Sequence, residues 1–302
     1  MIKGGQKMIK NPILNNMPKD KAKMKKKVDI GALIICFIAI LFTIAPMYVM
    51  LVTSIETYEE TNYANFVWWP ADGPTFESYV DILTGKNVPI DLMQSLWNTL
   101  WMYIPSILIG IFVSTMAGYA FAKLEFRMKG FMFAVLMSTM MLPNTMSMIS
   151  SFLLYDAIGW TMTPLPLMIP KMFGTMSVVF FVRQYLSSLP VDIINSAKID
   201  GAGNYSIFFE IVIGVAKPIM IAQFMICFIG AYNDYTNPLL YIHNTELYPL
   251  QLALAFFQDP WKQNWPQRMA GCVITMIPLV ILYIISQRFI LEGMSMSIAL
   301  KG

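Results

Sequence analysis

The sequence predicts an all-α integral membrane protein with six transmembrane helices and both termini in the cytoplasm. Hydrophobic residues make up 57% of the chain and charged residues only 13%, whereas soluble domains carry about 25% charged residues. Six stretches reach the roughly 20 apolar residues with which a helix crosses a bilayer. They are approximately 30–54, 95–122, 130–154, 166–188, 218–242 and 268–290.

The stretch 30–54 follows a tail, residues 1–28, that contains nine lysines and is predicted to be a basic cytoplasmic segment. Its opening, DIGALIICFIAILF, is too long for the apolar core of a signal peptide, so a retained signal-anchor helix is favoured over a cleaved signal. The tail is interpreted as a topology signal, and contact with anionic membrane lipids is the other role open to it.

The basic residues in the loops predict the orientation. The loop 55–94 contains one basic and seven acidic residues, whereas the loop 123–130 contains three basic residues and the segment 195–218 contains Lys198 and Lys217. Because basic residues concentrate in cytoplasmic loops, this segment and both termini are predicted to face the cytoplasm. All tryptophans then fall on the external side, either as an interfacial anchor or as a rim that docks an external protein or substrate. They are Trp68, Trp69, Trp97, Trp101, Trp160, Trp261 and Trp265.

Several predicted spans contain helix breakers and small residues, which favours a packed bundle that moves. Membrane helices tolerate such breakers where neighbouring helices or water satisfy the freed backbone groups, and small residues let helices approach closely. The breakers are Pro46, Pro105, Pro143, Gly174 and Pro278, and one small-residue face consists of Ser114, Ala117, Gly118 and Ala120.

The segment 195–218, NSAKIDGAGNYSIFFEIVIGVAKP, predicts two short helices on the cytoplasmic surface between the fourth and fifth spans. Ser187 or Ser188 is predicted to cap the first helix, which has Pro190 in its first turn and ends at Gly201 and Gly203. The second carries an apolar face and is separated from the fifth span by Gly214 and Pro218. An amphipathic helix that rests in the lipid headgroups is the alternative interpretation.

This segment resembles the cytoplasmic coupling loop, or EAA loop, of permease subunits in binding-protein-dependent ABC importers, whose pattern is approximately EAAxIDGASxxxxFxxIxLPxxKP. The match has no gap and includes Ala197, Ile199, Asp200, Gly201, Ala202, Phe208, Ile211, Lys217 and Pro218. The departures are Asn195 for Glu, Ser196 for Ala, Gly203 for Ser and Gly214 for Pro. In the family the Glu helps to engage the ATPase, so the resemblance implies that Asn195 keeps a hydrogen bond there without an ion pair.

The resemblance covers the chain from about residue 30 to the end. The motifs WNTL, AGYAFAK, MMLP, FVRQYLSSLP, NDYTNPLL and QRFILEG and the terminal KG are similar to those of the carbohydrate-uptake branch. They most resemble the second permease of maltose-type importers. Residues 29–302 are therefore expected to form one ABC transporter transmembrane domain in a bacterial-type cell membrane.

The resemblance implies a transport subunit and not an enzyme, with neither catalytic nor metal-binding residues. The sequence contains no GxxxxGK[ST] phosphate loop, so no cofactor is expected in this chain; ATP and Mg²⁺ belong to a partner ATPase. The implied partners are a homologous second permease, a cytoplasmic ATPase dimer and an extracytoplasmic sugar-binding protein, with no nucleic acid.

The coupling residues implied by the resemblance are Asn195, Ser196, Ala197, Asp200, Gly201, Ala202, Phe208 and Ile211. Candidate substrate-path residues, chosen because sugars need hydrogen-bonding side chains inside the membrane, are Asn144, Tyr232, Asn233, Asp234 and Asn237. Asn233 and Asp234 also fit a cap or turn at the outer end of the fifth span. Lys171, at the outer end of the fourth span, also fits a lysine that snorkels to the interface.

Two further segments have implied contacts. The external loop 243–267 corresponds to a loop that touches the binding protein, through Phe256, Phe257, Trp261 and Trp265, or it is an interfacial segment. The tail Met294–Gly302 corresponds to one that reaches the ATPase interface.

Three other classes of protein share some of these features. An ABC permease for peptides or amino acids shares the coupling loop but usually lacks the C-terminal motifs. An ion-coupled secondary transporter predicts inverted repeats and paired intramembrane carboxylates. A membrane enzyme predicts a cluster of His, Cys or acidic residues within the spans, which contain almost no acids.

Overall fold

The computed structural model describes residues 30–62, 67–190, 192–257 and 264–299, and within these ranges every regular element is helical. The predicted all-α class is confirmed. The chain divides into two compact units, residues 1–49 and 50–302. The predicted basic tail 1–28 lies outside the described residues.

The first unit is represented by most of α1 (Ile30–Ser54), a 25-residue helix that contains Pro46. Its large apolar side chains from Ile30 to Val49 are exposed around the helix. A helix that is hydrophobic on all sides suits a lipid environment. The predicted first span has the same limits as this helix.

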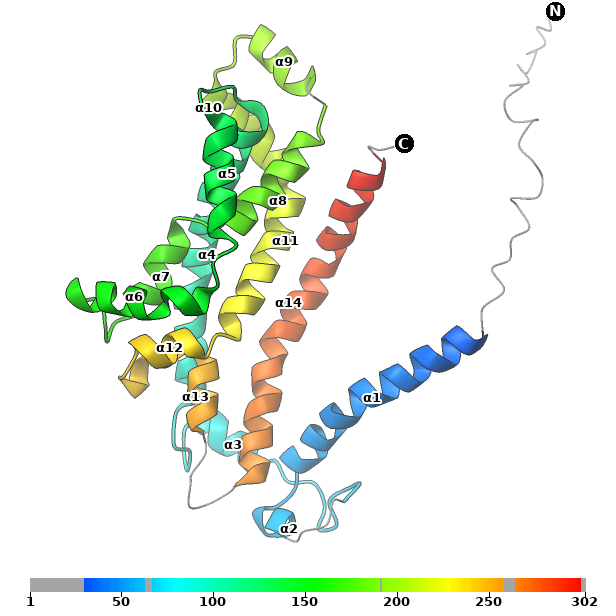
Figure 1. Cartoon of the computed structure of the whole chain (residues 1–302). Coiled ribbons are helices and arrows are strands. Elements are labelled where there is room, and N and C mark those ends of the chain that lie inside the picture. Colours follow the sequence, from blue (N-terminus) through cyan, green and yellow to red (C-terminus); the bar gives the residue numbers. More distant parts are fainter. Residues whose placement is uncertain (1–29, 63–66, 191, 258–263, 300–302) are drawn as a thin grey trace, which may run out of the picture. The chain divides into compact units, whose positions relative to one another are not determined.

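The second unit begins with α2 (Tyr58–Asn62), α3 (Glu77–Thr84), α4 (Leu92–Lys123), α5 (Lys129–Thr139) and α6 (Asn144–Ala157). It continues with α7 (Leu165–Met172), α8 (Met176–Ser187), α9 (Asp192–Ile199), α10 (Asn204–Ser206), the π-helical η3 (Ile207–Val212) and α11 (Ile213–Tyr232). It ends with α12 (Thr236–Tyr241), the 3₁₀ turn η4 (Thr245–Leu247), α13 (Leu250–Phe256) and α14 (Trp265–Ala299). In Figure 1, α4, α8, α11 and α14 run along one direction, with α9 at one end of the unit and α3 at the other.

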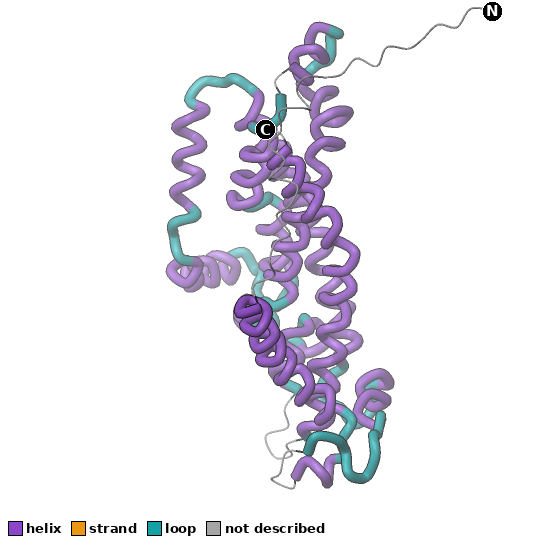
Figure 2. The backbone as a smooth tube through the Cα atoms, turned by 90° about the vertical axis from the view of Figure 1, so that its right-hand side faces the viewer, coloured by secondary structure: helices purple, strands orange, loops and turns teal. Residues whose placement is uncertain are grey.

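Five helical stretches of the described chain are long and apolar enough to cross a membrane, so the six-span count is not confirmed. They are Ile30–Ser54, Leu92–Lys123, Leu165–Ser187, Asn204–Tyr232 and Trp265–Gln287. The predicted span 130–154 is two shorter helices, and α6 turns across the direction of α5 (Figures 1 and 2). Pro143 immediately precedes α6, where it has no amide to donate and disfavours helical geometry at the residue before it.

The stretch Leu165–Ser187 also has a break, between α7 and α8 at Gly174. Gly174 has φ +86°, a conformation that a side chain disfavours. The amide of Thr175 donates a hydrogen bond of 3.1 Å to Ser114 Oγ on α4. The neighbouring helix therefore satisfies a backbone group that the break leaves free.

Helix α4 is the centre of the second unit and packs against α7, α8 and α11. Gly110, Ser114 and Gly118 are buried and lie four residues apart, on one face of the helix. A Cβ atom at Gly110 would overlap the carbonyl oxygen of Lys171, and one at Gly118 would lie 2.8 Å from Val182 Cγ1. This face therefore lets the backbones of α7 and α8 approach α4, as the small residues predict.

Candidate functional site

The surface loop around α9 has a defined end. Gly201 has φ +85°, and the amides of Gly201 and Ala202 donate to the carbonyls of Lys198 and Ala197 at 3.1 and 2.9 Å. This pair of bonds is a Schellman motif. The prediction that Gly201 ends the first coupling helix is confirmed.

The predicted separation of the second coupling helix from the fifth span is wrong. α10, η3 and α11 follow one another without a break from Asn204 to Tyr232, and both Gly214 and Pro218 lie inside α11. Pro218 removes only one backbone hydrogen bond, and packing around Val212 and Ala216, which are buried, keeps the helix continuous. The span also ends at Tyr232, ten residues before the predicted limit of 242, and α12 is a separate helix.

The eight predicted coupling residues divide by exposure. Asn195, Ser196, Asp200 and Gly201 are exposed. Ala202 and Ile211 are half-buried, whereas Ala197 and Phe208 are buried. The Phe208 ring lies 5.8 Å, between centroids, from both Phe112 and Tyr119 of α4. One part of the set therefore faces outward and the other part fixes the loop to the bundle.

Two large side chains of this loop that were not selected as site residues are nearly fully exposed. Ile199 is 86% exposed and Tyr205 is 79% exposed. Ile194 and Ala197, three residues apart on α9, are buried, and Ile199 lies off that face. An apolar residue out of register with the buried face of its helix is the signal that could have identified Ile199. We call Asn195, Ser196, Ile199, Asp200, Gly201 and Tyr205 the outward face of the loop.

The base of the loop is held by three contacts that involve α4, α5, α8 and α11. Lys123 Nζ donates to the carbonyl of Leu189 at 2.8 Å, which joins the end of α4 to the start of the loop. Arg183 of α8 lies 4.0 Å from the ring centroid of Phe133 on α5, and Tyr185 Oη donates to the carbonyl of Val215 at 3.2 Å. These contacts join the start of the loop and the neighbouring ends of the helices to one another.

We expect Lys123→Met to loosen this base. A hydrogen bond from a charged group contributes about 1.5–3 kcal/mol, and partial exposure favours the lower end, so amide exchange at residues 188–196 should rise about tenfold. Lys129→Met is the matched control because Lys129 binds the Leu124 carbonyl and the exposed Glu125. Equal exchange in the two variants would show that the Lys123–Leu189 bond does not hold the loop.

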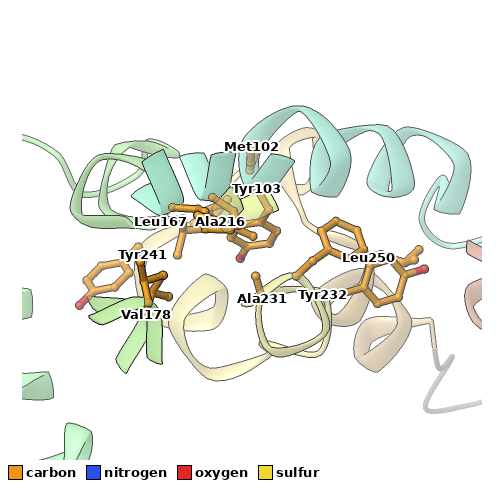
Figure 3. Close-up of a cluster of buried hydrophobic side chains, with 14 of the residues drawn as sticks. Met102, Tyr103, Leu167, Val178, Ala216, Ala231, Tyr232, Tyr241 and Leu250 are labelled. Atoms are coloured by element: carbon orange, nitrogen blue, oxygen red, sulfur yellow. The ribbon is translucent and has the colours of Figure 1, made fainter. Parts of the chain in front are cut away.

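A cavity of about 240 Å³ lies between α4, α7, α8 and α11. Two charged residues are at its wall, Lys171 of α7 and Asp234, which follows α11. The Lys171 ammonium is 5.3 Å from the ring centroid of Tyr103, a fully buried residue of α4. Figure 3 shows Tyr103 extending from α4 towards Ala231 of α11. The cavity lining consists of Ile107, Gly110, Ile111, Lys171, Gly174, Thr175, Ser177, Val178, Cys227, Gly230, Ala231 and Asp234.

Only Asp234 among the predicted substrate-path residues lines this cavity. Tyr232 is buried and its hydroxyl donates to the Thr275 carbonyl at 2.8 Å. Asn233 is the C-cap residue of α11, and Asp234 accepts from the amide and the side chain of Asn237 at 3.1 and 2.8 Å. The predicted cap and turn are thus present. The side chain of Asn144 lies outside the described part of the structure.

The described part of the loop 243–267, which is predicted to be external, is tied to α4. Asn98 Nδ2 donates to the carbonyls of Glu246 and Tyr248 at 2.7 and 3.2 Å, and the Leu250 amide donates to Thr99 Oγ1 at 2.8 Å. Of the four aromatic residues predicted to touch a binding protein, Phe257 is buried, Phe256 and Trp265 are exposed, and Trp261 lies outside the described residues.

Comparison with known proteins places these features in a family. Residues 82–296 match the family described as "Binding-protein-dependent transport system inner membrane component". The chain belongs to this family. It is therefore a multi-pass membrane protein of a transport system, in agreement with its five long apolar helices.

Individual relatives agree with this family. A probable ABC transporter permease of Pyrococcus horikoshii is 29% identical over 82% of this chain and 90% of its own length. The arabinooligosaccharides transport system permease AraQ of Halalkalibacterium halodurans is 29% identical over 68% of this chain and 73% of its own length. The fold matches a bacterial ABC transporter that imports the acidic polysaccharide alginate, with a TM-score of 0.73 and 22% identity over 86% of this chain and 95% of that one.

Proposed function

We propose that this chain is the permease subunit of an ATP-driven importer of sugars or oligosaccharides. Family membership supports the transport role, and the likeness to an arabinooligosaccharide permease supports the sugar class. The observation that carries the proposal is the coupling loop, whose sequence fits the importer pattern and whose outward face is exposed. A separate cytoplasmic ATPase dimer supplies the energy, because the sequence contains no phosphate loop; ATP and Mg²⁺ are bound there.

The assembled transporter has two further components in this proposal. A homologous second permease pairs with this chain to form the pathway, and an extracytoplasmic binding protein delivers the sugar. Helices α5 and α6 together provide the sixth crossing. α5 is apolar but has only 11 residues, too few to cross a bilayer alone. Basic residues at the base of the coupling loop support a cytoplasmic location for that end and for both termini; they are Lys123, Lys129, Arg183 and Lys198.

The proposed coupling step is mechanical. The outward face docks on the ATPase, and Phe208 transmits the movement of the loop to α4. Because Asn204–Tyr232 is one continuous helical stretch, a displacement at the loop also reaches the cavity at the other end of α11. Closure of the ATPase dimer thereby changes the side of the membrane to which the bundle is open.

The test is the ATPase activity of the complex reconstituted with the second permease, the ATPase and the binding protein, measured over a panel of sugars, peptides and amino acids. Ile199→Asp should reduce sugar-stimulated hydrolysis and ATPase co-purification about 30-fold, as expected for an interface hot spot of about 2 kcal/mol. Ile199 is 86% exposed, so the substitution leaves the core intact.

The matched control is Leu83→Asp on α3, a 59% exposed leucine at the opposite end of the unit. This variant should retain wild-type sugar-stimulated hydrolysis and wild-type co-purification of the ATPase. Normal ATPase binding by Ile199→Asp would contradict the docking account. Stimulation by peptides or amino acids in place of sugars would favour the alternative importer class.

A further inference from the structure

The cavity between α4, α7, α8 and α11 contains an ammonium group whose bonding capacity is unused. Lys171 makes no hydrogen bond or ion pair with any residue in the described part of the chain; its Nζ lies over the Tyr103 ring. A lysine has three N–H donors. A charged group held inside a membrane span without acceptors is costly and indicates a functional site.

The depth of Lys171 follows from its contact with α4. A Cβ atom added to Gly110 would overlap the Lys171 carbonyl oxygen, and Gly110 lies 18 residues into the 32-residue helix α4. The backbone of Lys171 is therefore near the middle of this helix. A lysine that only snorkels requires neither a cavity nor an opposite charge in its wall, and Lys171 lines a cavity that Asp234 also lines.

Asp234 provides the opposite charge. Both of its oxygens accept hydrogen bonds from Asn237, which fixes the carboxylate. A carboxylate has about four acceptor sites, so acceptor capacity remains towards the cavity that Asp234 lines. Lys171 and Asp234 both line this cavity, and the buried Tyr103 hydroxyl has no hydrogen-bond partner among the described residues.

We propose that this cavity binds one ring of a neutral sugar, with Lys171 donating to one hydroxyl and Asp234 accepting from another. The proposal rests on the sugar-import function and adds a subsite within this subunit. Each sugar hydroxyl both donates and accepts, so a sugar can use a cation and an anion that line the same cavity. A singly charged ligand is attracted by one of the two groups and repelled by the other, so the two together do not favour it.

The size of the cavity supports a single ring. Its volume of about 240 Å³ is below the roughly 300–1,000 Å³ of pockets for drug-sized ligands.

The test uses the complete transporter in proteoliposomes, with saturating binding protein, and measures labelled sugar taken up per ATP hydrolysed. The probes are arabinotriose and raffinose, which are neutral, and trigalacturonate, which is anionic. Lys171→Met and Asp234→Asn should each lower neutral-sugar uptake per ATP about tenfold, as for loss of a hydrogen bond to a charged group. Stimulated hydrolysis and assembly should be unchanged. Asp234→Asn should also raise the uptake of trigalacturonate above the wild-type level, because the substitution removes a negative charge that repels this anion.

Two controls separate binding from structure. Cys272→Ala, on α14 and outside the cavity lining, should match the wild type because it removes no group from the cavity wall. The exchanged pair Lys171→Asp with Asp234→Lys should remain defective if the groups bind sugar in a fixed geometry. Recovery of uptake in this pair would show an ion pair that needs only opposite charges and would overturn the subsite.

The remaining outcomes are also decisive. Unchanged uptake per ATP in both single variants, with a wild type that transports neutral sugar, would overturn the subsite and leave the import function standing. A wild type that responds only to trigalacturonate would overturn the neutral class. No response to any of the three sugars would count against the sugar function and against the subsite together.

Discussion

Phe208→Ala should destabilise the protein by about 3–5 kcal/mol and uncouple hydrolysis from transport. The residue is 2% exposed and its ring packs against Phe112 and Tyr119 of α4. Removal of a buried Phe leaves a cavity that costs this much, and the lost aromatic pairs account for about 0.5–1.5 kcal/mol each. Because Phe208 joins the loop to α4, the remaining loop should move without moving the bundle. Thermal unfolding in detergent and sugar uptake per ATP measure the two effects.

Phe209→Ala is a matched control of the same residue type at the adjacent position. Phe209 is 57% exposed, and its ring lies 6.1 Å from that of Phe112 and 5.2 Å from that of Phe208. Its removal should therefore cost less than that of Phe208, about 1–2 kcal/mol, and should disturb coupling less. Equal loss of stability in the two variants would contradict the orientation of η3. A stable but uncoupled Phe209 variant would instead place a contact with the ATPase or the second permease at that side chain.

The helical class and the end of α9 could be predicted because each depends on local chemistry. Composition alone excludes a soluble domain, and a glycine between a polar helix end and an apolar segment is the usual residue for the left-handed position that Gly201 occupies. The split of the stretch 130–154 is different. The mean hydropathy over about 20 residues depends on the length of an apolar stretch and not on the direction of the chain, so it does not reveal the turn before Pro143. Pro143 itself is the local signal for a break at this position.

The sequence predicts a break within Asn204–Tyr232 because this stretch contains two residues of low helix propensity, and this prediction is wrong. Gly214 and Pro218 are poor helix formers, but propensity is a weak effect that tertiary packing overrides. Val212 and Ala216, on either side of Gly214, are 3% and 0% exposed, and their burial against the bundle stabilises the helix. The sequence records where a helix can break, and the packing decides whether it does.

The charged cavity could not be predicted because its residues are far apart in the chain. Lys171 lies on α7 and Asp234 follows α11, and neither stands in a motif that indicates the other. The five substrate-path candidates are predicted because sugars need hydrogen-bonding side chains inside the membrane. Tyr232 and Asn233 instead satisfy backbone groups of this chain. Polarity identifies a residue that needs a partner, whereas only the fold shows whether it already has one.

Gly110→Ala should be the most damaging single-atom change in the bundle. The added Cβ would overlap the Lys171 carbonyl oxygen and lie 3.2 Å from its carbonyl carbon. Both are backbone atoms, so no side chain can rotate away, and α4 and α7 must separate. Overpacking costs about 1–3 kcal/mol and sometimes more, and a rigid backbone contact favours the upper end. The melting temperature of the purified complex measures it.

Gly214→Ala is the corresponding change inside α11, where a Cβ atom meets nothing within 4 Å. Alanine is a better helix former than glycine by about 1 kcal/mol, so this variant should be as stable as the wild type or more stable. If Gly110→Ala were equally stable, the close approach of α4 to α7 would be wrong. The same glycine also lines the cavity with Lys171. Separation of the two helices should therefore lower sugar uptake per ATP as well as stability, because the spacing that permits the contact also sets the position of the lysine.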